Sequence, residues 1–268
     1  MKEISRISVM ILAALTLLAF SMPAQASATT DARIVSAAEE SYVFKTYLKD
    51  DDIKVTSKDG VVTLTGTVAD NNGKTLAQET AAGLPGVKSV RNNLKVAGES
   101  VSETSDTWLM TKVKATLLYH RNVSGFNTEV NVQDGIVTLK GEAPSRAHKD
   151  LTTEYAQSVE GVKRVSNEMT VAKSDDKARG TADKAKATAG EKIDDVVEYI
   201  DDASVTALVK TTLLYNRSTS GLNTKVETND GVVTLSGKAS NNAEVDLASR
   251  ITRDVKGVES VRNQMTVE

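Results

Sequence analysis

Asp59–Gly66 reads DGVVTLTG, and this octapeptide returns twice with small changes. The second copy, DGIVTLKG, occupies Asp134–Gly141, and the third, DGVVTLSG, occupies Asp230–Gly237. A Gly-Val pair follows 27 residues after each aspartate. Three matched motifs with one internal spacing indicate three copies of a single structural unit. Because the copies are 75 and then 96 residues apart, we expect three separate small domains and not a closely stacked solenoid.

The order of elements within each copy follows from local chemistry. Asp-Gly between two β-branched runs predicts a hairpin, because both central residues of a type I′ turn need positive φ. Each hairpin is followed by a residue that caps a helix and then by a glycine suited to the left-handed position near a helix end. The caps are Asp70, Ser145 and Asn241, and these glycines are Gly86, Gly161 and Gly257. The strand glycines Gly66, Gly141 and Gly237 predict a bulge or a close backbone approach. A preceding helix, clearest over 108–121 and 204–217, and an alternating third strand complete an α-β-β-α-β unit.

This order, the DGVVTLxG strand and the GVxxVxN ending resemble the BON domain, the bacterial OsmY and nodulation domain. The resemblance covers 32–97, 105–172 and 201–268, which are the three domains that we expect. It implies an α+β fold with three tandem α-β-β-α-β domains, each a small three-stranded mixed sheet with two helices on one face. It also implies a protein of the periplasm or envelope, in a family associated with phospholipid binding, stress response and chaperone-like activity.

Two segments lie outside the three copies. Residues 1–26 have the pattern of a secretory signal peptide, with two basic residues, an apolar run over 7–20 and an A-x-A cleavage site at 24–26. A membrane anchor is the alternative, but a spanning helix needs roughly 20 apolar residues. We therefore expect a periplasmic protein that begins near Ser27 and, since the chain has no cysteine, carries no lipid anchor on an N-terminal cysteine. Segment 173–200 is a charged, alanine-rich linker whose spacing predicts a helix, with a flexible linker as the alternative.

No combination of residues in the chain supports catalysis. The two histidines, His120 and His148, do not recur in the third copy, where Asn216 and Glu244 take their places. We interpret both histidines as solvated surface residues. Nucleotide-binding, zinc-protease and serine-hydrolase motifs are missing. We therefore expect no enzyme activity, no cofactor, no metal site and no small-molecule substrate. Basic and acidic residues nearly balance, 33 against 36 in the whole chain, so nucleic acid is not an expected partner.

The first helix of each copy carries the candidate binding surface. At 100° per residue, Leu109, Val113 and Leu117 share the face that we expect to pack on the core. Trp108, Lys112, Ala115 and Tyr119 lie on nearly the opposite side, and Ser204, Leu208, Thr211 and Tyr215 match them in the third copy. For the first copy we take the loop before the hairpin to be five residues shorter, which gives Ala38, Tyr42, Lys45 and Lys49 as the counterparts.

The candidate lipid-binding residues are Trp108, Lys112, Tyr119, Leu208 and Tyr215. Aromatic rings flanked by lysine suit a membrane interface, where the rings reach acyl chains and the polar tips stay wet. In the alternative, the same stripe packs against a neighbouring copy or the linker helix. The expected partners are an anionic phospholipid or membrane surface, or envelope proteins. We expect peripheral phospholipid association that supports envelope integrity or an osmotic-stress response, with a periplasmic chaperone or protein-interaction scaffold as the alternative.

Overall fold

The computed structural model describes residues 23–97, 105–123, 125–172, 199–219 and 223–268. We refer to residues 23–97 as domain 1, 105–172 as domain 2 and 199–268 as domain 3. Most of the predicted signal peptide and almost all of the predicted linker helix lie outside the described residues. Within the described part of the chain, none of the helices is long and apolar enough to cross a bilayer.

The same order of elements recurs in the three domains. Domain 1 contains α1 (Pro23–Glu40), α2 (Tyr42–Thr46), β1 (Asp52–Lys58), β2 (Val61–Val68), α3 (Asn71–Gly83) and β3 (Ser89–Val96). Domain 2 contains α4 (Asp106–Tyr119), a short 3₁₀ turn η1 (Gly125–Asn127), β4 (Thr128–Gln133), β5 (Ile136–Ala143), α5 (Arg146–Ser158), β6 (Arg164–Asn167) and β7 (Thr170–Val171). Domain 3 contains α6 (Asp202–Tyr215), β8 (Asn223–Asn229), β9 (Val232–Ala239), α7 (Asn242–Arg253), β10 (Ser260–Asn263) and β11 (Thr266–Val267).

Each domain has a small mixed sheet, as the family resemblance implies. In domain 1 the central strand β2 pairs antiparallel with β1 and parallel with β3. The sheets of domains 2 and 3 repeat this arrangement, except that the third strand is divided into two short strands. The predicted caps are also confirmed, because the side chains of Asp70, Ser145 and Asn241 accept hydrogen bonds from backbone N–H groups in the first turns of α3, α5 and α7.

The Asp-Gly turns have the backbone that the sequence predicts. The φ angles of Asp59, Asp134 and Asp230 are 55°, 52° and 48°, and the glycine after each is also positive. The close approach predicted at the strand glycine is confirmed too: a Cβ added to Gly66 would lie 1.9 Å from the carbonyl oxygen of Asp52. Local sequence therefore fixes the hairpin of every domain.

One repeated pair of hydrogen bonds joins the first helix of each domain to its hairpin turn. An aspartate in the first turn of α4 and of α6 accepts the backbone N–H groups of both turn residues, and α1 does the same through Asp31. The pairs of distances are 2.7 and 2.9 Å to Asp31, 2.6 and 2.9 Å to Asp106, and 2.8 and 2.9 Å to Asp202. Since the spacing from this aspartate to the turn is identical in the three domains, the predicted five-residue shortening in domain 1 is wrong. The first helix of domain 1 is instead interrupted at Ser41, which caps α2.

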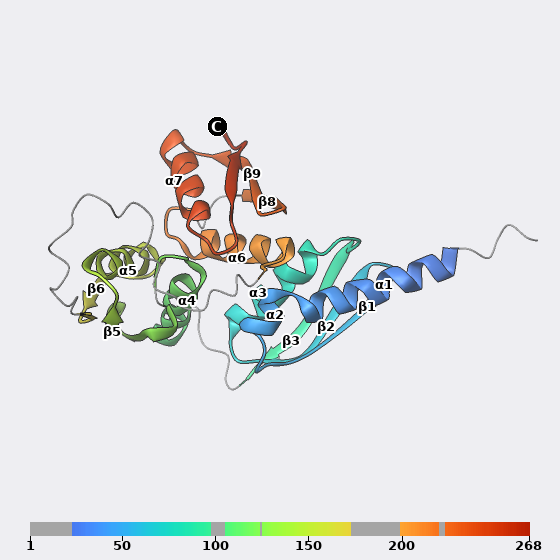
Figure 1. The fold of residues 1–268 in the computed structure, drawn as a ribbon, viewed down its shortest axis with the longest axis horizontal. Coiled ribbons are helices and arrows are strands. Elements are labelled where there is room, and N and C mark those ends of the chain that lie inside the picture. The colour runs from blue at the N-terminus through green and yellow to red at the C-terminus, as the bar shows by residue number, and fades with distance from the viewer. Residues whose placement is uncertain (1–22, 98–104, 124, 173–198, 220–222) are drawn as a thin grey trace, which may run out of the picture.

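The three domains are not separate globules. One hydrophobic cluster joins domains 1 and 3 and includes Ala115 and Tyr119 of domain 2, whereas the rest of the domain 2 core forms a second cluster. Figure 1 shows α6 at the centre, between the sheet of its own domain and the helices α3 and α4. Because partners cover α6 on several sides, every residue from Ala203 to Val209 is buried.

Candidate functional site

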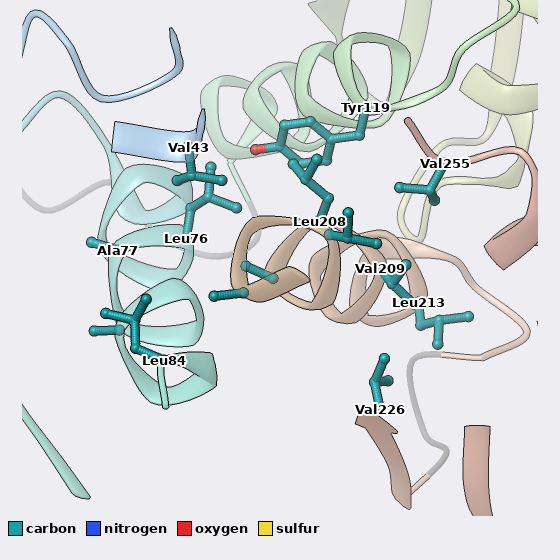
Figure 2. Packing of buried hydrophobic residues seen from close by; sticks show 14 of the residues in the cluster. Val43, Leu76, Ala77, Leu84, Tyr119, Leu208, Val209, Leu213, Val226 and Val255 are labelled. Atoms are coloured by element: carbon teal, nitrogen blue, oxygen red, sulfur yellow. The ribbon is translucent and has the colours of Figure 1, made fainter. Parts of the chain in front are cut away.

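The predicted core face of the first helix is confirmed, but its opposite face is not free. Leu109, Val113 and Leu117 are buried in the core of domain 2. Tyr119, Leu208 and Tyr215 are also buried, with exposed fractions of 1%, 0% and 3%. The expectation that these three side chains face solvent is wrong. Figure 2 shows Tyr119 and Leu208 together in the cluster to which α3, α4 and α6 contribute. They lie where the alternative interpretation placed them, between neighbouring copies.

Hydrogen bonds and ring contacts join the three domains at this point. The hydroxyls of Tyr119 and Tyr215 both donate to the Asn72 side-chain oxygen on α3, at 3.0 and 3.2 Å. Burial raises the pKa of both tyrosine hydroxyls, so they remain protonated donors. Tyr47 packs edge-on against Tyr119, with ring centroids 5.2 Å apart. One amide oxygen of domain 1 therefore contacts domains 2 and 3 together.

Domains 2 and 3 contact each other through a pseudo-twofold interface. His120 pairs with Val255 as an antiparallel bridge, and Asn216 pairs with Val159 in the same way. Both residues of the second bridge are related to those of the first by the 96-residue offset between copies two and three. Such an interface, in which equivalent patches meet each other, is the kind that relates subunits in a twofold dimer.

The interpretation of His120 as a solvated surface residue is wrong. Its side chain is 1% exposed, and its ring lies 3.8 Å from that of Tyr155 between centroids. Nδ1 is 2.6 Å from the carbonyl oxygen of Thr116, which accepts a hydrogen bond from it. His148, by contrast, is half-buried, and its Nδ1 lies 2.8 Å from the hydroxyl of Ser145 at the start of α5. His120 is thus part of the domain interface.

An open groove remains beside this interface and keeps part of the candidate surface accessible. Its volume is about 770 Å³, and it runs between α4, the Asp-Gly turn of domain 2 and the end of α6. Trp108 is half-buried and meets Tyr215 edge-on at 5.7 Å between ring centroids. Lys112 is half-buried as well and donates to the carbonyl oxygen of Glu160 at 2.9 Å. Of the five candidates, Trp108, Lys112 and Tyr215 therefore line one groove.

The groove carries charges of both signs around an apolar floor. Lys112 and Lys163 supply the positive charges, and Asp106, Asp134 and Glu160 supply the negative ones. The carboxylate of Asp106 is already engaged by two backbone N–H groups of the hairpin turn. The rim of the groove therefore presents two ammonium groups together with the carboxylates of Asp134 and Glu160.

Leu214 and Lys163 are among the groove residues that the sequence did not single out as binding candidates. Leu214, in the last turn of α6, is 49% exposed, although most of its helix is buried. A local signal for Leu214 exists in the sequence. A leucine is needed at this position of α6 only where another element covers it. Lys163 follows the Gly-Val pair of domain 2, where Glu259 stands in domain 3. That change of sign between copies distinguishes domain 2 from domain 3.

Comparisons with known proteins agree with the repeat. The family model "BON domain" matches residues 30–98, 105–173 and 201–268. Osmotically-inducible protein Y of Escherichia coli is 30% identical over 198 residues, covering 69% of this chain and 90% of that protein. A 21 kDa hemolysin of Actinobacillus pleuropneumoniae is 31% identical over 42% of this chain and 59% of its own length. The outer membrane lipoprotein DolP of Haemophilus influenzae is 30% identical, with the same coverages.

Proposed function

We propose, on the premise that this chain belongs to the BON domain family, that it is an exported envelope protein that attaches peripherally to phospholipid bilayers. Similarity to an osmotically-inducible protein and to an outer membrane lipoprotein supports a role in the envelope under osmotic stress. The predicted signal peptide supports export, and N-terminal sequencing of the exported protein tests it, with Ser27 as the expected first residue.

The groove of domain 2 is the surface through which we expect lipid contact. The observation that carries this proposal is the exposed Leu214 beside the half-buried Trp108, with Lys112 and Lys163 at the same rim. Apolar side chains with lysines beside them suit the boundary between acyl chains and head groups. In this arrangement Leu214 and Trp108 enter the bilayer boundary, and the lysines meet lipid phosphates.

Co-sedimentation with vesicles tests the proposal. The processed protein is mixed with vesicles of phosphatidylethanolamine and phosphatidylcholine, and with vesicles that also contain phosphatidylglycerol. Leu214→Ser removes the exposed apolar group without opening the core, and we expect it to weaken binding to both vesicles by about five-fold or more. Val267→Ser is the matched control, because Val267 is 45% exposed at a sheet edge remote from the groove in sequence.

Two results separate this function from its alternative. Weaker binding by Leu214→Ser but not by Val267→Ser supports lipid contact at the groove. If the wild-type protein binds neither vesicle yet suppresses aggregation of an unfolded outer-membrane protein, the lipid proposal fails and a chaperone or scaffold role replaces it.

A further inference from the structure

The sheet of domain 1 has one open face. Side chains alternate along each strand, and Val55, Leu64 and Leu94 are buried on the face that the helices cover. The opposite face is formed by the residues between them. On the central strand these are Val61, Thr63, Thr65 and Thr67, which form a row of short, mostly hydroxyl-bearing side chains.

Positive charges flank this row on both sides. Lys54 and Lys58 of β1 lie on the open face, and so do Arg91 and Lys95 of β3. The register places Lys54 opposite Thr65 and Arg91 opposite Thr63. All four bases are exposed, and the one acid of these strands on the same face is Asp52, at the strand's first residue. The open face therefore carries four bases against one acid.

The corresponding faces of domains 2 and 3 are different. In domain 2, Lys140 lies 3.8 Å from Glu168. In domain 3, Lys225 and Lys238 pair with Glu227 and Glu268 at 2.6 and 2.5 Å. Among the described residues, by contrast, the four bases of the domain 1 face form no ion pair. The copies share a fold, so the four unpaired bases on the open face are a property of domain 1 and not of the repeat.

We propose that the open sheet face of domain 1, formed by Lys54, Lys58, Arg91 and Lys95, is an electrostatic contact surface for anionic phospholipid bilayers. This inference deepens the proposed function, on which it rests, by adding a second and chemically different contact. The bases are spread in two dimensions, about 13 Å along a strand and about 10 Å across the sheet. A flat array of this kind matches a flat array of lipid phosphates better than a single linear polyanion.

The two contacts differ in their response to salt and lipid. A lysine or arginine near an anionic leaflet contributes about five-fold to partitioning, which corresponds to about 1 kcal/mol. This attraction is screened beyond about 10 Å at 0.1 M salt. Binding through the sheet face therefore requires anionic lipid and weakens as salt is added. Apolar insertion at Leu214 does not require anionic lipid and is not weakened by salt.

A charge-matched pair of variants tests the inference. The first carries Lys54→Gln, Lys58→Gln, Arg91→Gln and Lys95→Gln. The control carries Lys140→Gln, Lys225→Gln, Lys238→Gln and Arg262→Gln, which remove four bases from the open faces of domains 2 and 3. Both variants lose the same net charge, and circular dichroism with thermal melting verifies that each folds. Co-sedimentation is measured with phosphatidylglycerol-containing and purely zwitterionic vesicles, at 50 and 300 mM NaCl.

We expect the domain 1 variant to bind phosphatidylglycerol vesicles about ten-fold or more weakly at low salt, with little change on zwitterionic vesicles. The control variant keeps most of its binding. Equal losses in the two variants, or none in either, overturn the inference. The groove proposal is then still decided by Leu214→Ser. The inference is also overturned if the wild-type protein binds soluble polyphosphate but no vesicles, and the domain 1 variant no longer binds polyphosphate; the partner is then a soluble polyanion.

Discussion

Arg121 and Arg217 reach across the junction of domains 2 and 3 in opposite directions and bind equivalent carbonyl groups. The guanidinium of Arg121 donates to the carbonyl oxygens of Val255, at 2.9 Å, and Val258. That of Arg217 donates to Val162, at 2.8 Å, and also to Val159 and Gln157. Each arginine therefore holds the turn after the second helix of the other domain. Two small domains, each with a limited core of its own, gain a common interface in this way.

The arginine contacts predict a loss of stability when the guanidinium is removed. Arg217→Lys keeps the charge but replaces the guanidinium, whose Nη2 contacts all three carbonyl oxygens, by a more compact and more strongly hydrated ammonium. We expect a fall in the free energy of unfolding of about 1–2 kcal/mol, measured from urea denaturation. Arg253→Lys, at the exposed end of α7, is the control and should leave the midpoint unchanged. Equal midpoints for Arg217→Lys and wild type would show that the contact does not stabilise the junction.

Tyr119, Tyr215 and Asn72 predict a coupling between all three domains. Tyr119→Phe and Tyr215→Phe each delete one hydrogen bond to Asn72, and we expect each to cost about 1 kcal/mol. In the background of Asn72→Ala both tyrosine changes should cost markedly less, because the shared acceptor is gone. Urea denaturation of the three single and two double variants gives the coupling. Additive losses would contradict a role for the shared oxygen.

His120 predicts a dependence of stability on pH. Burial lowers the pKa of His120, a shift that Lys256 reinforces and that the Thr116 carbonyl and Asp254 oppose. The unfolded chain therefore binds a proton at this histidine near pH 6.5, whereas the folded chain keeps the imidazole neutral to a lower pH. The stability of the folded state is therefore fully retained above that pH and declines as the pH falls toward 5. We expect His120→Asn, which copies Asn216 of domain 3, to lose less stability between pH 7.5 and 5.0 than wild type. His148→Asn is the control, and an identical pH response in all three proteins would refute the assignment.

The aspartate that binds the hairpin turn of each domain predicts a loss of stability when its carboxylate is removed. Asp202→Ala removes the acceptor for the N–H groups of Asp230 and Gly231, and we expect a loss of about 1–2 kcal/mol. Asp246→Ala, on the exposed side of α7, changes the same charge without touching a turn. Thermal or urea unfolding compares the two. A loss no larger than that of Asp246→Ala would mean that the turn is stable without this contact.

The sequence predicted the features that depend on near neighbours. The Asp-Gly turns, the caps at Asp70, Ser145 and Asn241 and the strand glycines require a particular backbone or donor within a few residues, so the residue types identify them. The core face of α4 followed from helical period for the same reason. These local rules were enough for the fold of one domain.

The candidate surface could not be predicted as reliably, because it depends on contacts between domains. Tyr119 and Leu208 have the composition of an exposed membrane stripe, and burial against another copy requires that same composition. Nothing in a helical wheel distinguishes the two environments. The positive charge of the open sheet face of domain 1 was hidden for a related reason. A count over the whole domain gives nine bases and nine acids, and it does not show that four of the bases gather on one face.

The packing of α3 against α6 has a consequence for the order in which the chain is made. The helix α3 belongs to the first domain to be synthesised, but Gly83 packs on Ala203 and Glu79 binds Lys210 at 2.8 Å, and both partners belong to the last. Until α6 has been made, the side of α3 that it covers has no partner in the native arrangement. A nascent or truncated chain therefore presents an unfinished apolar surface, which is the feature that quality-control proteases and chaperones recognise. Synthesis of the third domain is thus the step that covers the exposed side of α3 in the first domain.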